Sequence, residues 1–282
     1  TSFAYTASPP YPQRVVSLAP SVTETLFALG FGNRLVGVTT YCDYPADARK
    51  LPKVGGFMNA SLETIVAKRP DVVLGVNSAT DPIKAREMER LGLKVKLISL
   101  ANVKEIFASI KSIAALMGSE EAGEQMVARI TEQMERVRKQ VAPAPRRSVL
   151  LAVGLRPLVA VGGKNYIDEL ITLAGGKNIA GNASQPWLNL PDEYVVAKAP
   201  QVIIEAGMGS ERGESTHHWA DLKSIPAVKE RRVYVYQSDK ILRPGPRIGE
   251  GLEEIARLVH PECFVLANSG AKEASGCESS RS

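Results

Sequence analysis

Histidine and cysteine, the residues best suited to metal binding or nucleophilic chemistry, are few in this chain. Its 282 residues contain three of each. His217 and His218 lie in a polar stretch with Glu211 and Glu214. Because the two histidines are adjacent, their side chains point in divergent directions, so this stretch is a weak candidate for a metal site. The cysteines form no CxxC pair and are odd in number, which indicates neither a zinc site nor a disulfide framework; at most one pair could form. They are Cys42, Cys263 and Cys277.

Glycine-rich and nucleophile motifs are equally sparse. Gly30-Phe31-Gly32 is followed by Leu35 where the dinucleotide-binding fingerprint has a third glycine. The sequence contains neither a phosphate-cradling P-loop motif nor the GxSxG turn of hydrolases. We therefore expect no catalytic residues, no metal and no cofactor, and we expect that the chain is not an enzyme.

Aromatic residues outside the core pattern are more informative. Tyr41 and Tyr44 flank Cys42-Asp43, Phe57 follows Gly55-Gly56, and Trp187 follows Pro186 in a stretch without periodicity. Each lies just after a predicted strand or just before a predicted helix, and loops at strand ends are where α/β sheets bind ligands. Rigid rings suit a flat organic ligand, although they could equally fill the cores of the lobes.

Two stretches of the chain, residues 62–74 and 192–204, read as copies of one another at an offset of 130 positions. Each contains a short helix, a proline and an apolar strand. Glu63 and Glu193 occupy the same place in the first turn of each helix, where an acidic side chain favours the helix dipole. The dipole accounts for either residue alone, whereas the matched pair would project one carboxylate from each of two similar lobes.

The charge distribution and the lengths of the apolar runs limit which partners and which cellular location we expect for this chain. The net charge is +5, but the Arg146-Arg147 and Arg231-Arg232 pairs join no basic stripe, so nucleic acid is not an expected partner. The apolar runs fall short of the roughly 18 residues that a membrane-spanning helix needs. The numbering opens at Thr1 without an initiator Met, which is compatible with a cleaved export signal or with a trimmed sequence.

Short apolar runs alternate with helical patterns along the chain, as they do in parallel-sheet α/β proteins. Ser21 and Ser61 are predicted N-caps. Strands are predicted at Val15–Leu18, Leu35–Val38, Val72–Leu74, Lys94–Leu97, Val149–Val153, Val159–Val161, Val202–Ile204 and Val233–Tyr236. Helices are predicted at Ser21–Leu29, Ser61–Lys68, Asp81–Leu91, Val103–Met117, Asn165–Ala174, Pro191–Ala197 and Gly249–Val259.

Two further patterns concern the overall organisation. Glu24–Gly30 followed by Gly32 is similar to Asp168–Ala174 followed by Gly176, which supports a duplication. Between the two halves, Ser119–Val141 has apolar residues spaced for one face of a helix about 34 Å long. Such a helix could join the two lobes as a strut or pack as an ordinary helix.

Several ordered motifs together resemble a known family. They cover about residues 14–262 and consist of Arg14–Ser21 with Thr23-Glu24, Gly37-Val38, Tyr41–Pro45, Leu62-Glu63 to Pro70–Val72, Pro186-Trp187 and Arg243–Arg247. In these the chain resembles the periplasmic substrate-binding proteins of ABC importers, of the helical-backbone type (class III), that carry cobalamin, haem or ferric siderophores. Within that family it is most similar to the cobalamin-binding members.

The resemblance implies an α/β fold of two Rossmann-like lobes with central, mostly parallel sheets, joined by a single long α-helix. The lobes are then expected at residues 14–118 and 147–262, the bridging helix at 119–142, a flexible N-terminus at 1–13 and a mobile tail at 263–282. It also implies a ligand held in the cleft between the lobes. The chain would be a monomer, exported to the periplasm with its signal peptide removed.

The resemblance further implies roles for single residues. Ligand contacts are expected from Tyr41, Phe57, Trp187, Asp239, Lys240, Ile241, Leu242 and Arg243. Glu63 and Glu193 match the glutamates that dock onto arginines of the transmembrane subunits of the importer. Lys240, Ile241 and Phe57 replace larger rings, and Val76 falls where a Trp is expected, so the ligand could be a different corrinoid, haem or a siderophore.

Three functions follow from these observations. The leading one is an extracytoplasmic carrier that captures cobalamin or cobinamide and delivers it to an ABC importer. A carrier of haem or of a ferric siderophore is the alternative, and an anionic siderophore would call on Arg156, Lys164, Arg243 and Arg247. A metal-cofactor enzyme or assembly factor on the same fold is a third function, for which Cys42 is the sole plausible cleft ligand.

Overall fold

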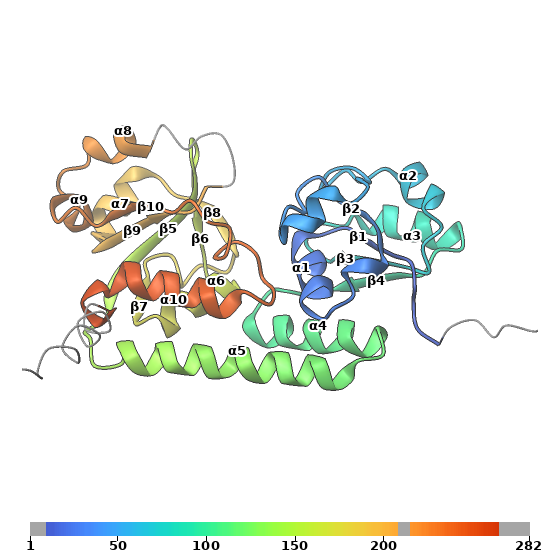
Figure 1. Cartoon of the computed structure of the whole chain (residues 1–282). Coiled ribbons are helices and arrows are strands. Elements are labelled where there is room, and N and C mark those ends of the chain that lie inside the picture. The colour runs from blue at the N-terminus through green and yellow to red at the C-terminus, as the bar shows by residue number, and fades with distance from the viewer. Residues whose placement is uncertain (1–9, 208–214, 265–282) are drawn as a thin grey trace, which may run out of the picture. The chain divides into compact units, whose positions relative to one another are not determined.

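The protein is described by a computed structural model that defines residues 10–207 and 215–264 (Figure 1). It divides into two compact units, the first formed by the chain up to Glu132 with Arg243–Ile248, the second by Gln133–Leu242 and the chain from Gly249 onward. The division falls inside helix α5 (Glu120–Val141), which is acidic in its first turn and basic in its last, as the helix dipole favours. The predicted two-lobed α/β fold is confirmed, while the predicted domain boundaries stay a prediction.

The first unit is built on a parallel sheet. Its strand order is β2-β1-β3-β4, and each strand runs parallel to its neighbours. The strands are β1 (Val15–Ser17), β2 (Leu35–Val38), β3 (Val72–Val76) and β4 (Val95–Ile98). The helices are α1 (Pro20–Ala28), α2 (Leu62–Ala67), α3 (Pro82–Arg90) and α4 (Val103–Leu116), with 3-10 turns at Gly32–Arg34 and Ala46–Lys50. Every residue of β3 is buried, as expected for a central strand covered on both faces.

The second unit has a mixed sheet of order β10-β9-β5-β6-β8, with β7 also paired to β5. Strands β9, β10 and β7 run parallel to their neighbours, whereas β6 is antiparallel to both β5 and β8. The strands are β5 (Arg147–Leu155), β6 (Leu158–Val161), β7 (Gly176–Asn178), β8 (Trp187–Asn189), β9 (Val202–Glu205) and β10 (Val233–Val235). The helices are α6 (Tyr166–Leu173), α7 (Asp192–Lys198), α8 (Ser215–Ala220), α9 (Pro226–Lys229) and α10 (Ile248–Val259), followed by a 3-10 turn at Pro261–Phe264.

The repeated helix–proline–strand pattern is confirmed as a repeated structure. Helix α2 and strand β3 correspond to α7 and β9. Arg69 and Ala199, at equivalent places after the two helices, both adopt a left-handed conformation with φ of 46°. The prolines that follow are buried, and each strand then pairs in parallel with the first strand of its unit, Val72 opposite Val15 and Val202 opposite Val149. The two units therefore use the same backbone arrangement between this helix and the sheet.

The structure confirms one predicted helix cap and contradicts another. The Ser61 hydroxyl accepts a hydrogen bond from the Thr64 amide at 3.2 Å, which confirms it as the N-cap of α2. The prediction for Ser21 is wrong, because α1 starts one residue earlier with Pro20 and its N-cap is Ala19. Trp187 was expected outside regular structure but begins β8, a three-residue strand too short to give an alternation in sequence.

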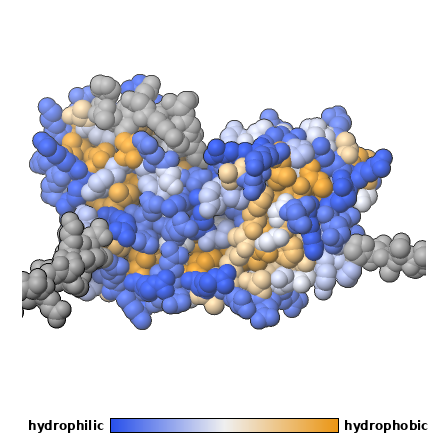
Figure 2. Space-filling view, in the orientation of Figure 1, coloured by the Kyte–Doolittle hydropathy of each residue, from blue (hydrophilic) through white to orange (hydrophobic). Residues whose placement is uncertain are grey.

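Some expectations fall outside the described residues. These are the ends of the chain at residues 1–9 and 265–282, Glu211, Glu214, the side chain of His217, and Cys277. Among the helices that are described, none combines the length and apolar character needed to cross a membrane. In the view of Figure 2, hydrophobic residues reach the surface of each unit in patches interrupted by hydrophilic residues.

Candidate functional site

A partly buried ion cluster lies in the first unit, where α1 meets the segment Arg243–Ile248. Glu24 is 3% exposed, and the Arg247 guanidinium binds it in a bidentate manner, with Nε and Nη2 each 2.7 Å from a carboxylate oxygen. Arg243 Nη1 lies 3.0 Å from Glu24 Oε1 and 2.6 Å from Asp43 Oδ1. We call Glu24, Asp43, Tyr44, Arg243 and Arg247 the Glu24 cluster.

The Glu24 cluster contains two cations and two anions, so its formal charges cancel. The Arg247 guanidinium also lies over the Tyr44 ring, 3.9 Å from the ring centroid, at a distance suited to a cation–π contact. Burial would raise the pKa of Asp43, but the hydrogen bond and charge of Arg243 lower it below the ordinary value of 3.8. Both arginines are thus held by internal carboxylates, which removes them as ready partners for an anionic ligand.

Tyr41 and Cys42 lie in the loop after β2, at the carboxyl end of the parallel sheet. Tyr41 is 62% exposed, and its carbonyl accepts a hydrogen bond from Arg243 Nη2 at 3.4 Å. Cys42 is 1% exposed, and its sulfur lies 3.1 Å from the hydroxyls of both Thr23 and Thr39. The tyrosine ring is therefore available to a ligand, whereas the thiol is enclosed by two hydroxyl groups.

Phe57 is presented by a tight loop whose ends are fixed by Gly55 and Ala60. These two residues form an isolated antiparallel bridge, and Gly55 has φ of 114°. A Cβ at Gly55 would come within 2.9 Å of the Ala60 backbone, so only glycine fits both the conformation and the space. The half-buried Phe57 ring lines a pocket in the first unit.

The segment predicted to contact ligand in the second unit follows β10. Lys240 forms ion pairs with Glu250 at 3.0 Å and Glu254 at 3.1 Å, and these two partners raise its pKa. Ile241 has no exposed surface, and its carbonyl accepts a hydrogen bond from the Tyr166 hydroxyl, so its side chain is a core group of the unit. Asp239 and Leu242 are half-buried.

Trp187 is placed on the edge strand β8, paired with Val161 of β6. It is 42% exposed, whereas the other tryptophan, Trp219, is 2% exposed and donates its indole N–H to Glu205. Trp187 is thus the tryptophan of the pair that solvent or a ligand can reach. Its role as a ligand contact, like those of Tyr41 and Phe57, stays a prediction.

Glu63 and Glu193 are both exposed in the first turns of α2 and α7. The Ser61 hydroxyl donates to Glu63 at 3.3 Å, a contact that keeps the carboxylate near the helix start. The equivalent helix α7 has Pro191 at the N-cap position, where no side chain caps the helix. Both carboxylates are accessible to a partner, as docking would require.

Among the side chains that the structure describes, no group of three or more His, Cys, Asp or Glu is placed to hold a metal ion. His218 faces Asp192, with Nε2 3.2 Å from the carboxylate, and its ring meets Trp219 edge-on at 4.6 Å between centroids. Cys42 and Cys263 are both free thiols.

Sequence reasoning missed the pairing of Glu24 with Arg243 and Arg247. All three residues lie in the motifs that carry the family resemblance, but a contact across 223 positions leaves no local pattern. It also missed Asp81 and Lys84, two charged residues that line the pocket of Phe57. The sequence predicts Asp81 only as the first residue of a helix. The structure confirms that place, because the Asp81 carboxylate caps α3 by accepting a hydrogen bond from the Ile83 amide at 2.8 Å.

The fold and these exposed groups define a two-lobed α/β binding protein, and comparison with known proteins identifies the family. Residues 15–240 match the family model described as "Periplasmic binding protein", and the chain belongs to this family. It is 32% identical over 263 residues to the uncharacterized ABC transporter substrate-binding lipoprotein YvrC of Bacillus subtilis (strain 168), covering 90% of this chain and 82% of that protein.

Two solved structures have similar folds. The periplasmic vitamin B12 binding protein BtuF of Vibrio cholerae superimposes with a TM-score of 0.79 at 25% identity, covering 90% of this chain and 98% of BtuF. The periplasmic heme-binding protein RhuT of Roseiflexus sp. RS-1 gives a TM-score of 0.80 at 25% identity, covering 89% of this chain and 99% of RhuT. The chain is thus a substrate-binding protein of the type that serves ABC importers, similar to proteins that bind vitamin B12 and to proteins that bind haem.

Proposed function

We propose that this chain is a periplasmic binding protein that captures a corrinoid, cobalamin or cobinamide, and delivers it to the transmembrane subunits of an ABC importer. On this proposal Tyr41, Phe57 and Trp187 contact the flat face of the ligand, and polar groups near Asp239 contact its rim. The chain itself catalyses no reaction and works as a monomer.

The observation that carries the choice of ligand is the charge balance of the Glu24 cluster. An anionic siderophore would call on Arg156, Lys164, Arg243 and Arg247, but two of these, Arg243 and Arg247, are already bound to Glu24. Lys240 is likewise bound, to Glu250 and Glu254. Drawing both guanidinium groups away from the buried Glu24 carboxylate would leave it unpaired, at a cost of about 3–5 kcal/mol. An uncharged ring system with aromatic contacts agrees better with such a site.

Titration of the purified protein with cyanocobalamin, cobinamide and haemin tests the proposal. Because Trp219 is buried and hydrogen-bonded, we expect Trp187 to report binding, so quenching by a corrinoid should disappear in Trp187→Phe and persist in Trp219→Phe. Calorimetry on Trp187→Phe separates loss of the reporter from loss of binding. Binding of haemin with silence toward both corrinoids would overturn the corrinoid assignment in favour of a haem carrier.

The enzyme alternative is tested at Cys42. Serine can keep the contacts to Thr23 and Thr39, so Cys42→Ser should leave corrinoid affinity unchanged within about twofold, because the sulfur is enclosed and not presented to a ligand. Complete loss of binding in a variant that still folds would favour a thiolate ligand and the metal-cofactor function.

A further inference from the structure

Helices α2 and α7 present the same three side chains, at the same spacing, on their outward faces (Figure 1). Residues three and four positions apart lie next to one another on one side of a helix, so each set forms a short row that starts with a carboxylate. All of these side chains are exposed. We call the two sets the α2 stripe and the α7 stripe; they consist of Glu63, Val66 and Ala67, and of Glu193, Val196 and Ala197.

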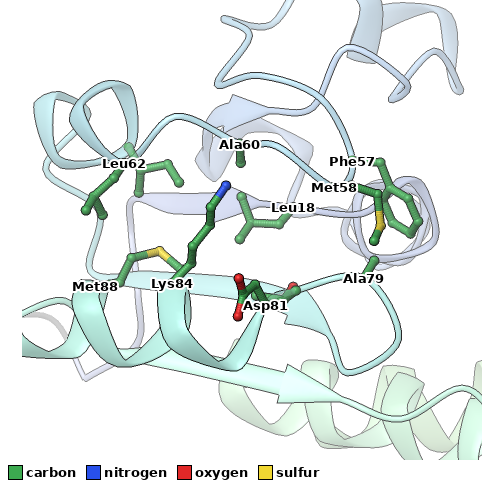
Figure 3. A pocket seen from close by; sticks show the side chains of 11 residues that line it. Leu18, Phe57, Met58, Ala60, Leu62, Ala79, Asp81, Lys84 and Met88 are labelled. Atoms are coloured by element: carbon green, nitrogen blue, oxygen red, sulfur yellow. The ribbon is translucent and has the colours of Figure 1, made fainter.

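The positions at which the two helices agree are the positions of the stripes. At the half-buried and buried positions the residues differ, Leu62, Thr64 and Ile65 in α2 against Asp192, Tyr194 and Val195 in α7. Leu62 and Ile65 line the pocket of Phe57 (Figure 3), whereas Val195 belongs to the core of the second unit. Packing restricts buried side chains and leaves most exposed ones free to vary, so identity confined to the exposed face has a cause other than packing.

The two valines also contribute little to the folding of their own units. Val66 is 38% exposed and Val196 is 37% exposed, so each leaves much of its apolar surface in water. A β-branched side chain loses rotamer freedom in a helix, and alanine is the better helix former at an exposed position. One exposed valine is ordinary on a protein surface, but two at equivalent places beside equivalent glutamates indicate a contact with another molecule.

The charge and the shape of the stripes define the kind of partner. Among the residues that the structure describes, neither Glu63 nor Glu193 forms an ion pair, although the Ser61 hydroxyl donates to Glu63. A free carboxylate is complementary to a cation on the partner, and the valine and alanine beside it are complementary to a small apolar area. The outward face of a helix is convex, which suits the surface of another protein rather than a small molecule, because small molecules bind in concave sites.

We propose that the α2 stripe and the α7 stripe are the two contact patches for the transmembrane subunits of the importer, and that Val66 and Val196 pack against apolar side chains next to the cations that bind the glutamates. The inference rests on the proposed function, since the partner is the importer to which the chain delivers its ligand. It assigns different roles within each stripe. The glutamate speeds association and orients the chain, and the valine slows dissociation.

The test measures binding of the full chain, loaded with cyanocobalamin, to the ABC importer for which wild type supports uptake, held in lipid nanodiscs. Val66→Ala and Val196→Ala should each raise the dissociation rate about fivefold, and together about twenty-five-fold, because each change removes two methyl groups from an apolar contact. The salt dependence of the association rate should stay as in wild type. Glu63→Gln should instead slow association and flatten its salt dependence.

The matched control is Leu91→Ala, which removes more apolar surface at a residue that is 58% exposed but lies at the C-cap of α3, outside both stripes. It should change neither rate. Urea unfolding checks the fold, and the two valine variants should be at least as stable as wild type because alanine favours helices.

The outcomes separate this inference from the proposed function. If the glutamate variant associates slowly but both valine variants dissociate like wild type, the role of the valines is overturned and the proposed function stands. If wild type binds the importer but supports uptake of haemin and of no corrinoid, the corrinoid assignment fails, and the valine variants, loaded with haemin, still decide the contact patches. If wild type supports uptake through no importer, the proposed function and this inference both fail.

Discussion

The two copies of the helix–strand unit, α2–β3 and α7–β9, are alike up to the strand and differ after it. In both, a left-handed residue and a buried proline precede a strand that pairs in parallel with the first strand of its unit. In both, the residue before the strand binds the neighbouring strand through its side chain: Asp71 accepts from the Arg14 amide at 2.8 Å, and Gln201 from the Ser148 amide at 3.0 Å.

The difference begins at the carboxyl end of the strand. At equivalent positions β3 has Gly75, which permits the tight turn above the pocket, and β9 has Glu205, which is buried and accepts the indole N–H of Trp219. The same contrast appears in the second similarity, where Glu24 holds two arginines while Asp168 accepts one hydrogen bond from Asn178 at 2.9 Å. The repeated parts set the scaffold, and the unrepeated side chains at the strand ends set what each unit can bind.

The largest expected effect tests whether the two exposed glutamates act alike. If these glutamates dock onto importer arginines as predicted, Glu63→Lys and Glu193→Lys should each reduce importer-dependent uptake of labelled cyanocobalamin at least about a hundredfold, because each lysine would face like charge. Affinity for the ligand, followed by Trp187 fluorescence, should not change. Glu89→Lys on α3 is the control and should leave uptake normal. An effect at one glutamate only would show that the two copies have different roles, and normal uptake in both variants would refute the docking proposal.

The next effect contrasts the equivalent acidic positions of α1 and α6. Glu24→Gln removes the carboxylate charge that both nearly buried guanidinium groups bind, so the free energy of unfolding should fall by about 3–5 kcal/mol. Asp168→Asn weakens one hydrogen bond to an amide that keeps a second acceptor, the Val161 carbonyl at 3.0 Å, and should cost about 1 kcal/mol. Urea unfolding measures both values, and equal losses would contradict the special role given to the Glu24 cluster.

The pH dependence of stability should have opposite signs at two carboxyls. The pKa of Asp43 is lowered, so its contribution is present above the ordinary value of 3.8 and is lost as the pH falls through the lower folded value. Burial raises the pKa of Asp168 above 3.8, so its contribution is present at more acidic pH and is lost as the pH rises through the folded value. Unfolding of wild type, Asp43→Asn and Asp168→Asn from about pH 2 to 6 should show the two variants diverging from wild type at opposite ends of this range. Parallel curves would contradict the assignment.

The smallest effect concerns the shared left-handed residues. Arg69→Gly and Ala199→Gly should each stabilise their unit by up to about 1 kcal/mol, because glycine adopts positive φ without the clash of a Cβ. Ala67→Gly, in α2 itself, should instead destabilise by about 0.5–1 kcal/mol. Thermal and urea unfolding measure these changes. A gain at only one of the two positions would show that the copies differ in backbone strain as well as in side chains.

The sequence determined the secondary structure and the class of fold because these depend on local patterns. Apolar runs predicted β2 at Leu35–Val38 without error and most other strands within a residue or two, and the offset of 130 positions predicted the paired α2–β3 and α7–β9 units. The strands β7 and β8 were missed because three residues carry no periodicity. The aromatic candidates Tyr41 and Trp187 could be named because large exposed rings outside a periodic pattern stand out in a sequence.

Only the tertiary structure decided which charges are free and which are satisfied. Arg243 and Lys240 look like ligand-binding cations in the sequence, yet one is held by Glu24 and Asp43 and the other by Glu250 and Glu254. Ile241 looks like a neighbour of the ligand, yet it is fully buried. Residue type and spacing fix local conformation through short-range sterics and hydrogen bonds, but the partner of a charged group is set by which segments the fold brings together, often hundreds of positions apart.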